Sequence, residues 1–265
     1  MTPLRIAVAG ACGRMGRTLV RLAAADPAFR VVAAVDQAGA AGVGQDAGVL
    51  AGVEPLGVAV ADRCPTDVDV LIEFTSSTGC RAWAEWCGRQ RVRLVSGTTG
   101  IDAAARAALQ AAAEQVAVLW SPNMSVGVNL LLELVSRAAA VLGDDWDVEI
   151  SEAHHRQKTD APSGTARALL EAVCAARRVE AERVAVHGRR SQLGPRKPGE
   201  IGVHALRLGG IVGAHDVHFA SAGEVLTLSH RALSRDIFAA GALRAARWIM
   251  SCPPGLYSMR DALQG

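Results

Sequence analysis

Short apolar runs alternate with helical patterns through the first half of the chain, and this alternation restricts the possible folds more than any other feature. The expected strands cover 4–9, 31–35, 68–74, 94–95 and 116–120, and the expected helices cover 14–25, 78–89 and a run from about residue 102. Strands without polar alternation, separated by helices, are typical of a parallel sheet that is covered on both faces. The sequence therefore predicts an α/β, doubly wound, Rossmann-like domain.

The pattern changes after Ser125. A long helix is expected over 126–142, a strand over 147–151, and a helix over 164–177 with Ser163 as its N-cap. Later segments alternate with period two and carry turns about every ten residues, which predicts a smaller α+β domain with a mostly antiparallel sheet. The last stretch, 236–250, is helical, and the polar loop 189–200 is expected to be irregular and mobile.

Composition excludes several classes of protein. Lys and Arg number 28 against 26 Asp and Glu, so a net charge of +2 gives no basic field for nucleic acid or an anionic membrane. No apolar run approaches 20 residues and the N-terminus does not resemble a signal peptide, so we expect a cytoplasmic protein. The six cysteines form no CxxC pair and no HExxH is present, so no metal site is expected.

Three glycines lie between the first strand and the first helix. Gly10, Gly13 and Gly16 allow a tight turn in which backbone N–H groups approach a pyrophosphate. Asp36 ends the second strand and can accept hydrogen bonds from an adenosine ribose. A glycine-rich turn without a ligand is the alternative, but the strand, turn, helix, strand and acid in this order favour dinucleotide binding.

Two further turns, SGTTG at 96–100 and SPNMS at 121–125, each follow an expected strand. For either one alone, an ordinary strand-exit turn is an equally good interpretation. Because ligands bind at the carboxyl ends of parallel strands, the two together favour a nicotinamide pocket.

The segment EAHHRQKTDAPSGTA, 152–166, combines groups that can move protons with groups that bind anions. The N–H groups of Gly164 and Thr165 at a helix start can bind a carboxylate, with His155 and Lys158 beside them. His154 can exchange protons near neutral pH. Only two of the 28 basic residues are lysine, and a lysine can release a proton where arginine cannot. Structural histidines and an incidental lysine remain nearly as good an interpretation.

This segment resembles the signature of the 4-hydroxy-tetrahydrodipicolinate (dihydrodipicolinate) reductases. AGACGRMG, SGTTG, SPNMSVGVNLL and SRDIFAAGALRAARW also resemble segments of that family, in the same order over essentially the whole chain. The resemblance implies NADH- or NADPH-dependent reduction of a cyclic dianionic dicarboxylate in the diaminopimelate route of lysine biosynthesis. It also implies a homotetramer built by the β-rich domain. It places 236–265 with 1–125 in a dinucleotide-binding domain, and leaves 126–235 as the substrate and tetramerisation domain.

The resemblance also implies roles for individual residues. His154 resembles the acid/base residue, Lys158 the proton donor, and His155, Gly164 and Thr165 the substrate-carboxylate contacts. The implied cofactor contacts are Gly10, Ala11, Cys12, Gly13, Arg14, Met15, Asp36, Gln37, Gly97, Thr98, Thr99, Ser121, Pro122, Asn123 and Met124.

The chain departs from a common family pattern at the end of the second strand. Many members have an acidic residue followed by arginine there, whereas this chain has Asp36 followed by Gln37. A carboxylate can bind both ribose hydroxyls of NADH but repels the 2′-phosphate of NADPH. Arg14 could offset part of that repulsion, and Arg17 is a weaker candidate. We therefore expect a preference for NADH with NADPH still accepted.

Two other functions fit a nucleotide-binding fold. An aldehyde dehydrogenase acting through a thiol needs an activated cysteine at a strand exit, whereas Cys80 and Cys87 lie in an expected helix. A non-catalytic dinucleotide sensor would not need His154, Lys158 and the Ser-Gly-Thr turn together. Both alternatives are disfavoured by the sequence.

Overall fold

The structure is a computed structural model that describes residues 2–191 and 194–264. It divides into two compact units, Met1–Val126 with Asp236–Gly265, and Gly127–Arg235. Within the described ranges, no helix combines the length and the apolar character needed to cross a membrane.

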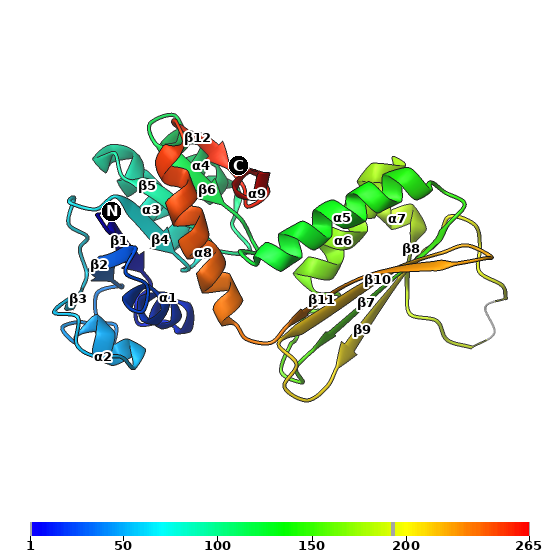
Figure 1. Ribbon diagram of the computed structural model, residues 1–265, viewed down its shortest axis with the longest axis horizontal. Helices are drawn as coiled ribbons and strands as arrows, with labels where there is room; N and C mark the ends of the chain where they lie inside the picture. The colour runs from blue at the N-terminus through cyan, green and yellow to red at the C-terminus, as the bar shows by residue number, and fades with distance from the viewer. Residues whose placement is uncertain (1, 192–193, 265) are drawn as a thin grey trace. The chain divides into compact units, whose positions relative to one another are not determined.

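The first unit contains a seven-stranded sheet in the order β12-β6-β5-β4-β1-β2-β3 (Figure 1). Every neighbouring pair is parallel. The strands are β1 Leu4–Ala9, β2 Phe29–Val35, β3 Val60–Ala61, β4 Val70–Glu73, β5 Arg93–Ser96, β6 Ala117–Trp120 and β12 Gly255–Tyr257. Because the pairs are parallel, the loops after β1, β2, β4, β5 and β6 all leave from one edge of the sheet.

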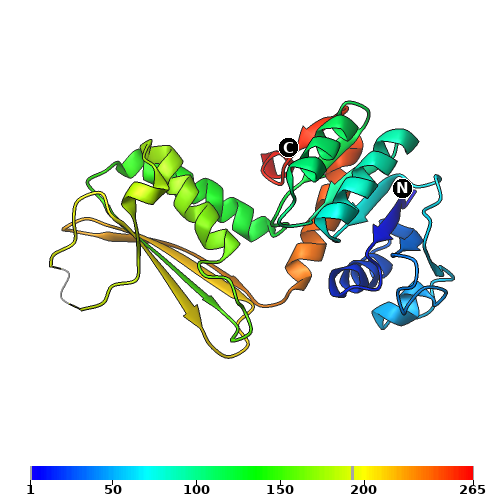
Figure 2. The same cartoon turned by 180° about the vertical axis from the view of Figure 1, so that it is seen from behind.

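Helices cover both faces of this sheet (Figures 1 and 2). The helices α1 Arg14–Ala24 and α8 Asp236–Trp248 pack against one face, and α3 Ser77–Gln90 and α4 Ala103–Ala113 pack against the other. The α8 face toward the sheet is built from alanines, including Ala239 and Ala242, which are fully buried. The predicted doubly wound α/β fold is confirmed.

The second unit has a five-stranded sheet in the order β11-β10-β7-β9-β8. The strands are β7 Asp147–His154, β8 Ala185–His187, β9 Ile201–Arg207, β10 Gly213–Ala220 and β11 Val225–Ala232. The strand β10 is antiparallel to both neighbours, as expected, but β9 is parallel to both of its own. The sheet is therefore mixed, because period-two alternation shows that a strand is half-buried and does not fix its direction.

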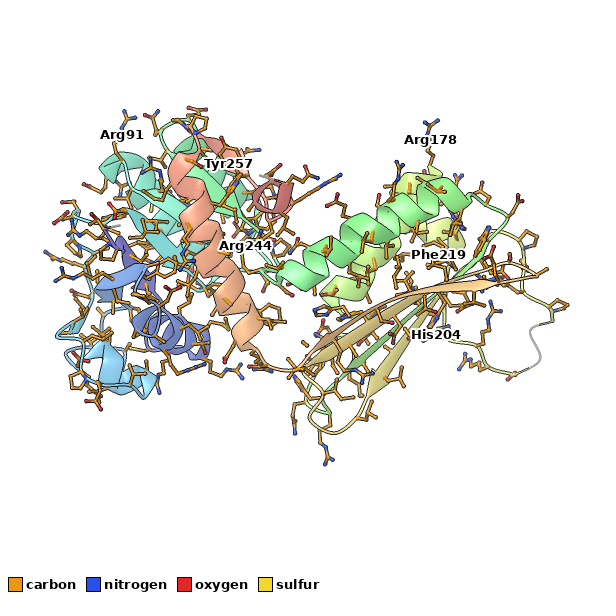
Figure 3. The ribbon with its side chains drawn as sticks, in the orientation of Figure 1. Arg91, Arg178, His204, Phe219, Arg244 and Tyr257 are labelled. Atoms are coloured by element: carbon orange, nitrogen blue, oxygen red, sulfur yellow. The ribbon has the colours of Figure 1, made fainter. Side chains whose placement is uncertain are left out.

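Helices of the second unit lie on one side of its sheet (Figures 1 and 2). These are α5 Val126–Leu142, α6 Gly164–Arg177 and the short α7 Ala181–Val184. Phe219, fully buried, lies on the helix side, and His204 lies on the other side (Figure 3). No helix of the described part of this unit covers that other face, where Leu206 is 47% and Val225 is 65% exposed.

Sequence patterns identified the long elements and missed the short ones. The helices α5 and α6 span the predicted residues, while β7 continues to His154 and therefore carries part of the 152–166 segment. The missed elements are β3, β8, β12, α2 Ala47–Ala51, α7, the 3-10 helix Ile249–Ser251 and α9 Asp261–Gln264. Elements of two to five residues hold too few side chains to show a period.

The mobility expected of the loop 189–200 falls partly on 192–193, which lie outside the described residues. In the described part of this loop, Arg196 donates to the carbonyl of Val148 at 2.9 Å and pairs with the carboxylate of Glu149. The loop is thus irregular, as predicted, and one of its arginines is bonded to the sheet.

Candidate active site

The glycine loop after β1 is a tight turn in which backbone atoms pack closely together. Gly10 has a φ of +75°, and a Cβ added at Gly16 would lie 2.2 Å from the carbonyl oxygen of Gly10. Gly13 is the N-cap of α1 and contributes no side-chain hydrogen bond to the first turn. The loop therefore keeps the N-terminus of α1 accessible to an anion such as a pyrophosphate.

Asp36 connects the end of β2 to this loop. Its Oδ2 accepts from the backbone N of Cys12 at 2.8 Å, and its Oδ1 accepts from the backbone N of Gln37 at 2.8 Å. Each carboxylate oxygen has a second lone pair, so the group can also accept from ribose hydroxyls. Arg17 donates from Nε to the carbonyl of Cys12 at 3.0 Å.

The buried carboxylate of Glu73 organises the turns after β4 and β5. Its Oε2 accepts from the backbone N and hydroxyl of Thr75 at 3.0 and 2.7 Å and from Thr98 Oγ1 at 2.7 Å, and its Oε1 accepts from Ser96 Oγ. Gly97 lies against the ring of Phe74, where a Cβ would come within 2.1 Å of a ring carbon. The SGTTG turn is thereby fixed, with Thr98 buried and Thr99 exposed.

The turn after β6 is held by its own side chains. Ser121 Oγ donates to the carbonyl of Asn123 at 2.8 Å, and the backbone N of Ser125 donates to Asn123 Oδ1 at 2.9 Å. Met124 is buried, and its carbonyl oxygen would lie 1.8 Å from a Cβ on Gly241 of α8. Pro122 is exposed. Because the strands are parallel, this turn lies at the same edge of the sheet as Gly10–Met15, Asp36, Gln37 and Gly97–Thr99.

The predicted catalytic residues all lie in the second unit. The backbone N of Lys158 donates to the carbonyl of His155 at 3.1 Å, and its Nζ donates to Asp160 at 2.8 Å. His155 Nε2 lies 3.2 Å from Nη2 of Arg235. Lys158 and His155 thus share one tight segment between β7 and α6.

Helix α6 begins at the anion-binding turn that the sequence predicts. Ser163 is its N-cap, with Oγ accepting from the backbone N of Ala166 at 3.2 Å. Gly164 is exposed, and a Cβ added there would meet nothing within 4 Å. The first turn, which includes Thr165, can therefore be approached by a carboxylate.

His154 is bonded to a buried carboxylate. Its Nδ1 lies 2.5 Å from Oε2 of Glu152, which is 1% exposed. Arg207 donates to both carboxylate oxygens of Glu152 at 2.9 and 2.8 Å, and the backbone N of Ser163 donates to Oε1 at 3.1 Å. Burial raises the pKa of Glu152, but the bonds from Arg207, His154 and Ser163 outweigh it and leave the pKa below its ordinary value.

A second histidine, His215 on β10, lies beside the first. The ring centroids of His154 and His215 are 5.3 Å apart, and His215 Nε2 lies 3.1 Å from Ser163 Oγ. Burial lowers the pKa of His215 to about 4. Burial also lowers the pKa of His154, although Glu152 opposes that change.

Two adjoining family models match nearly the whole chain. Residues 4–124 match the model described as dihydrodipicolinate reductase, N-terminus, and residues 127–263 match that described as dihydrodipicolinate reductase, C-terminus. The chain belongs to the dihydrodipicolinate reductase family. Relatives named 4-hydroxy-tetrahydrodipicolinate reductase in Anaeromyxobacter sp. and Thiobacillus denitrificans are each 49% identical over 98% of this chain and 97% and 98% of theirs.

A solved dihydrodipicolinate reductase of this family has the same fold. The dipicolinate-bound enzyme from Paenisporosarcina sp. TG-14 superimposes with a TM-score of 0.78, at 25% identity, over 97% of each chain. The resemblance found in the sequence motifs is thereby confirmed for the whole chain.

The sequence motifs of this chain missed several residues of its candidate site. Arg207 and His215 lie more than 50 positions after Glu152 and reach it only through the register of β9 and β10. One signal was available: Glu152 and His154 are two positions apart, so in a strand they lie on one face. A carboxylate buried on that face requires a cation, and Arg207 provides it.

Proposed function

We propose that this chain is a 4-hydroxy-tetrahydrodipicolinate reductase that acts in the diaminopimelate route of lysine biosynthesis. The observation that carries the proposal is full-length membership of the reductase family together with the bonds from one buried carboxylate, Glu152, to His154 and to Ser163, the N-cap of α6. A dianionic dicarboxylate needs donors for its carboxylates and a group that exchanges protons beside them. The second unit has both.

The first unit is proposed to bind the nicotinamide dinucleotide. The Gly10–Met15 loop leaves room for a pyrophosphate, Asp36 has lone pairs for a ribose, and the turns at 97–99 and 121–124 lie at the same sheet edge. The bound cofactor supplies the hydride. The residues therefore fit the group that the family requires.

The second unit is proposed to bind the substrate and to balance the charge that reduction introduces. His155 and the N–H groups of Gly164 and Thr165 hold the carboxylates. Lys158 donates a proton, and His154 exchanges one as the hydroxylated precursor loses water. Each of these residues lies at the end of β7, in the following segment, or in the first turn of α6.

Cys80 and Cys87 do not fit thiol chemistry. Burial raises the pKa of Cys80 to about 12, and it raises that of Cys87 well above its ordinary value. A thiol with so high a pKa is a poor nucleophile at neutral pH. The aldehyde dehydrogenase alternative is therefore rejected.

The decisive assay follows NADH or NADPH oxidation while the substrate is generated from pyruvate and aspartate semialdehyde by a coupling enzyme. We expect turnover that depends on both precursors. No turnover with either cofactor, from protein that still binds NADH, would favour the sensor alternative instead.

We also propose that NADH is preferred. Gln37 is exposed and neutral where a cation would offset the charge of Asp36. Arg17 contacts the carbonyl of Cys12, whose N–H holds Asp36, so it is a candidate, with Arg14, to meet a 2′-phosphate. A single arginine outside the Asp36–Gln37 pair offsets only part of the repulsion between Asp36 and the 2′-phosphate.

The chain is further proposed to assemble as a homotetramer through the face of the five-stranded sheet that no described helix covers. Exposed apolar side chains on and beside this face include Leu206, Leu208, Val225 and Leu233, the last 87% exposed. Apolar patches of this kind mark association sites. Sedimentation should give a tetramer for the wild type and smaller species for Leu206→Glu, and a monomeric wild type would contradict the proposal.

A further inference from the structure

We infer that Glu152, Arg207 and Gly213 are positioning residues that hold His154 in one tautomer, with its Nε2 facing an open approach. The inference rests on the proposed function, because it assigns to His154 the proton exchange of that reaction. It extends the proposal by naming the residues that make this exchange possible and the ring nitrogen that performs it.

The tautomer follows from the donor and acceptor inventory. An ionised carboxylate only accepts, and the pKa of Glu152 is below its ordinary value, so the proton in the 2.5 Å contact belongs to Nδ1 of His154. In the neutral ring, Nε2 then carries the free lone pair. The reactive nitrogen is therefore Nε2.

The approach to Nε2 depends on the absence of a side chain on β10. Gly213 lies across from His154, one step beyond the Ala153–Ala214 pair, and a Cβ added there would lie 3.1 Å from Nε2. The φ of Gly213 is not positive, so its backbone does not require glycine. A Cβ there would instead crowd Nε2, so the ring of His154 would have to shift by a few tenths of an ångström.

The same carboxylate reaches the other predicted substrate groups. Glu152 Oε1 accepts from the backbone N of Ser163, which caps α6, and Arg207 donates to the carbonyl of Asp160 at 2.6 Å. Asp160 in turn holds Lys158. One ion pair thus ties His154, the anion-binding turn and the segment that carries Lys158 into a single arrangement.

Stability alone does not account for this ion pair. The Glu152 side chain is fully buried and the Arg207 side chain is 21% exposed, and desolvating such a pair offsets most of its attraction. An apolar pair would serve the core of the sheet equally well. An ionised carboxylate, which can only accept, does keep the proton of a histidine on Nδ1.

The groups that act on His154 fix the sign of the test. Glu152 raises its pKa, whereas burial, Lys158 and Arg207 lower it, and the ring of His215 packs against it. Removing the carboxylate charge in Glu152→Gln should therefore lower the titration midpoint of His154. A glutamine can also donate to Nδ1, which would move the ring proton to Nε2.

The test combines nitrogen-15 histidine NMR of the ligand-free protein with kinetics. The His154 signal is assigned from its loss in His154→Ala. We expect the Nδ1–H tautomer in the wild type, a lower midpoint and a changed tautomer in Glu152→Gln, and a ~10²-fold lower kcat with an unchanged KM for NADH. An Nε2–H wild type, or an unchanged tautomer and pH profile in Glu152→Gln, would overturn the inference.

Gly213→Ala tests the approach separately and keeps the inference testable if Glu152→Gln folds poorly. It should retain the Nδ1–H tautomer and still lose at least about tenfold in kcat. Gly223→Ala is the matched control, since a Cβ there meets nothing within 4 Å, and it should keep wild-type kcat. Full activity in Gly213→Ala would refute the open approach. The NMR result stands even if the wild type fails to reduce the proposed substrate, so the two failures are distinguishable.

Discussion

Each unit places one buried carboxylate near the end of a central strand, and the two are satisfied in different ways. Glu73 on β4 accepts from hydroxyls and a backbone N–H, whereas Glu152 on β7 accepts from an arginine, a histidine and a backbone N–H. Hydroxyl donors can rotate to suit a changed partner, but a guanidinium cannot become an acceptor. The first network fixes backbone turns that we propose contact the cofactor, while the second holds ionisable groups that we propose transfer protons.

The largest expected effect separates these two roles. His154→Ala or Lys158→Ala should lower kcat by ~10²–10⁴-fold, because each removes a group proposed to transfer a proton. Lys158→Arg should fail as well, because arginine keeps the charge but does not release a proton. Steady-state kinetics and NADH titration measure the two properties.

Lys197→Arg is the control for these variants, since Lys197 is the other lysine of the chain and is exposed in the loop before β9. It should keep wild-type kcat. If His154→Ala or Lys158→Ala weakened NADH binding as strongly as it lowered kcat, the division of roles between the two carboxylate networks would be wrong.

The second prediction compares the two carboxylates directly. Glu152→Gln should lower the free energy of unfolding by roughly 3 kcal/mol, because it leaves the charge of Arg207 without its buried partner. Glu73→Gln should cost about 1 kcal/mol, because Ser96 and Thr98 can rotate their hydroxyls toward the new amide. Urea unfolding of both variants measures the difference. Equal losses would mean that donor type does not matter here.

The third prediction concerns acid stability in the second unit. The pKa of His215 is about 4 when folded, against an ordinary 6.5, because burial disfavours its charged form. The unfolded chain binds this proton more readily than the folded chain does. The contribution of His215 to the free energy of unfolding is therefore greatest above about pH 6.5 and falls by roughly 3 kcal/mol as the pH drops to about 4.

His154, Glu152, His230 and Asp216 are the charged or titratable groups that act on His215. Unfolding free energies of the wild type and of His215→Gln, measured between pH 4 and pH 7, isolate its share. The variant should show the shallower pH dependence. Parallel curves would assign the acid sensitivity to another group.

The fourth prediction sharpens the role of the turn that Glu152 holds. Dipicolinate should compete with the substrate, and Thr165→Val should weaken its binding by about 1–3 kcal/mol through the loss of a charge-assisted hydrogen bond. The inhibition constant of dipicolinate measures this loss. Thr227→Val, the same substitution on β11, is the control and should leave that constant unchanged. An unchanged constant in Thr165→Val would move the carboxylate site away from α6.

The smallest expected effect lies at the proposed cofactor site of the first unit. The wild type should favour NADH by ~10-fold in kcat/KM, which is about 1.4 kcal/mol. Gln37→Arg should raise kcat/KM for NADPH, because a guanidinium would pair with the 2′-phosphate. Arg14→Ala and Arg17→Ala, each made in the wild type, should lower kcat/KM for NADPH, and the larger loss identifies the arginine nearer the 2′-phosphate. A wild type that prefers NADPH would contradict this account.

Sequence reasoning recovered the parts of the molecule that depend on local order. The alternation of short apolar runs with helical patterns and the period of α5 are local, so the doubly wound sheet and the long helices followed from them. The direction of β9 did not follow, because strand periodicity carries no direction.

The candidate site shows the same division. The 152–166 segment is contiguous, and its residues could be named from sequence. Arg207, Gly213 and His215 could not be named, because an arginine, a glycine or a histidine in a strand has no special meaning until its cross-strand neighbours are known. Glu73 was hidden for a similar reason, since its partners Ser96 and Thr98 belong to another strand and its turn.

The strand β12 and the helix α8 return to the first unit after the whole second unit has been encoded, and this order has a consequence during synthesis. A ribosome adds about 5–20 residues per second, so roughly 5–20 seconds pass between Val126 and Asp236. Throughout that interval the core face later covered by Ala239, Ala242, Leu243 and Ile249 has no partner from its own chain. We therefore expect the nascent N-terminal segment to expose apolar surface of the kind that chaperones bind, and the inserted unit to be complete before the unit that surrounds it.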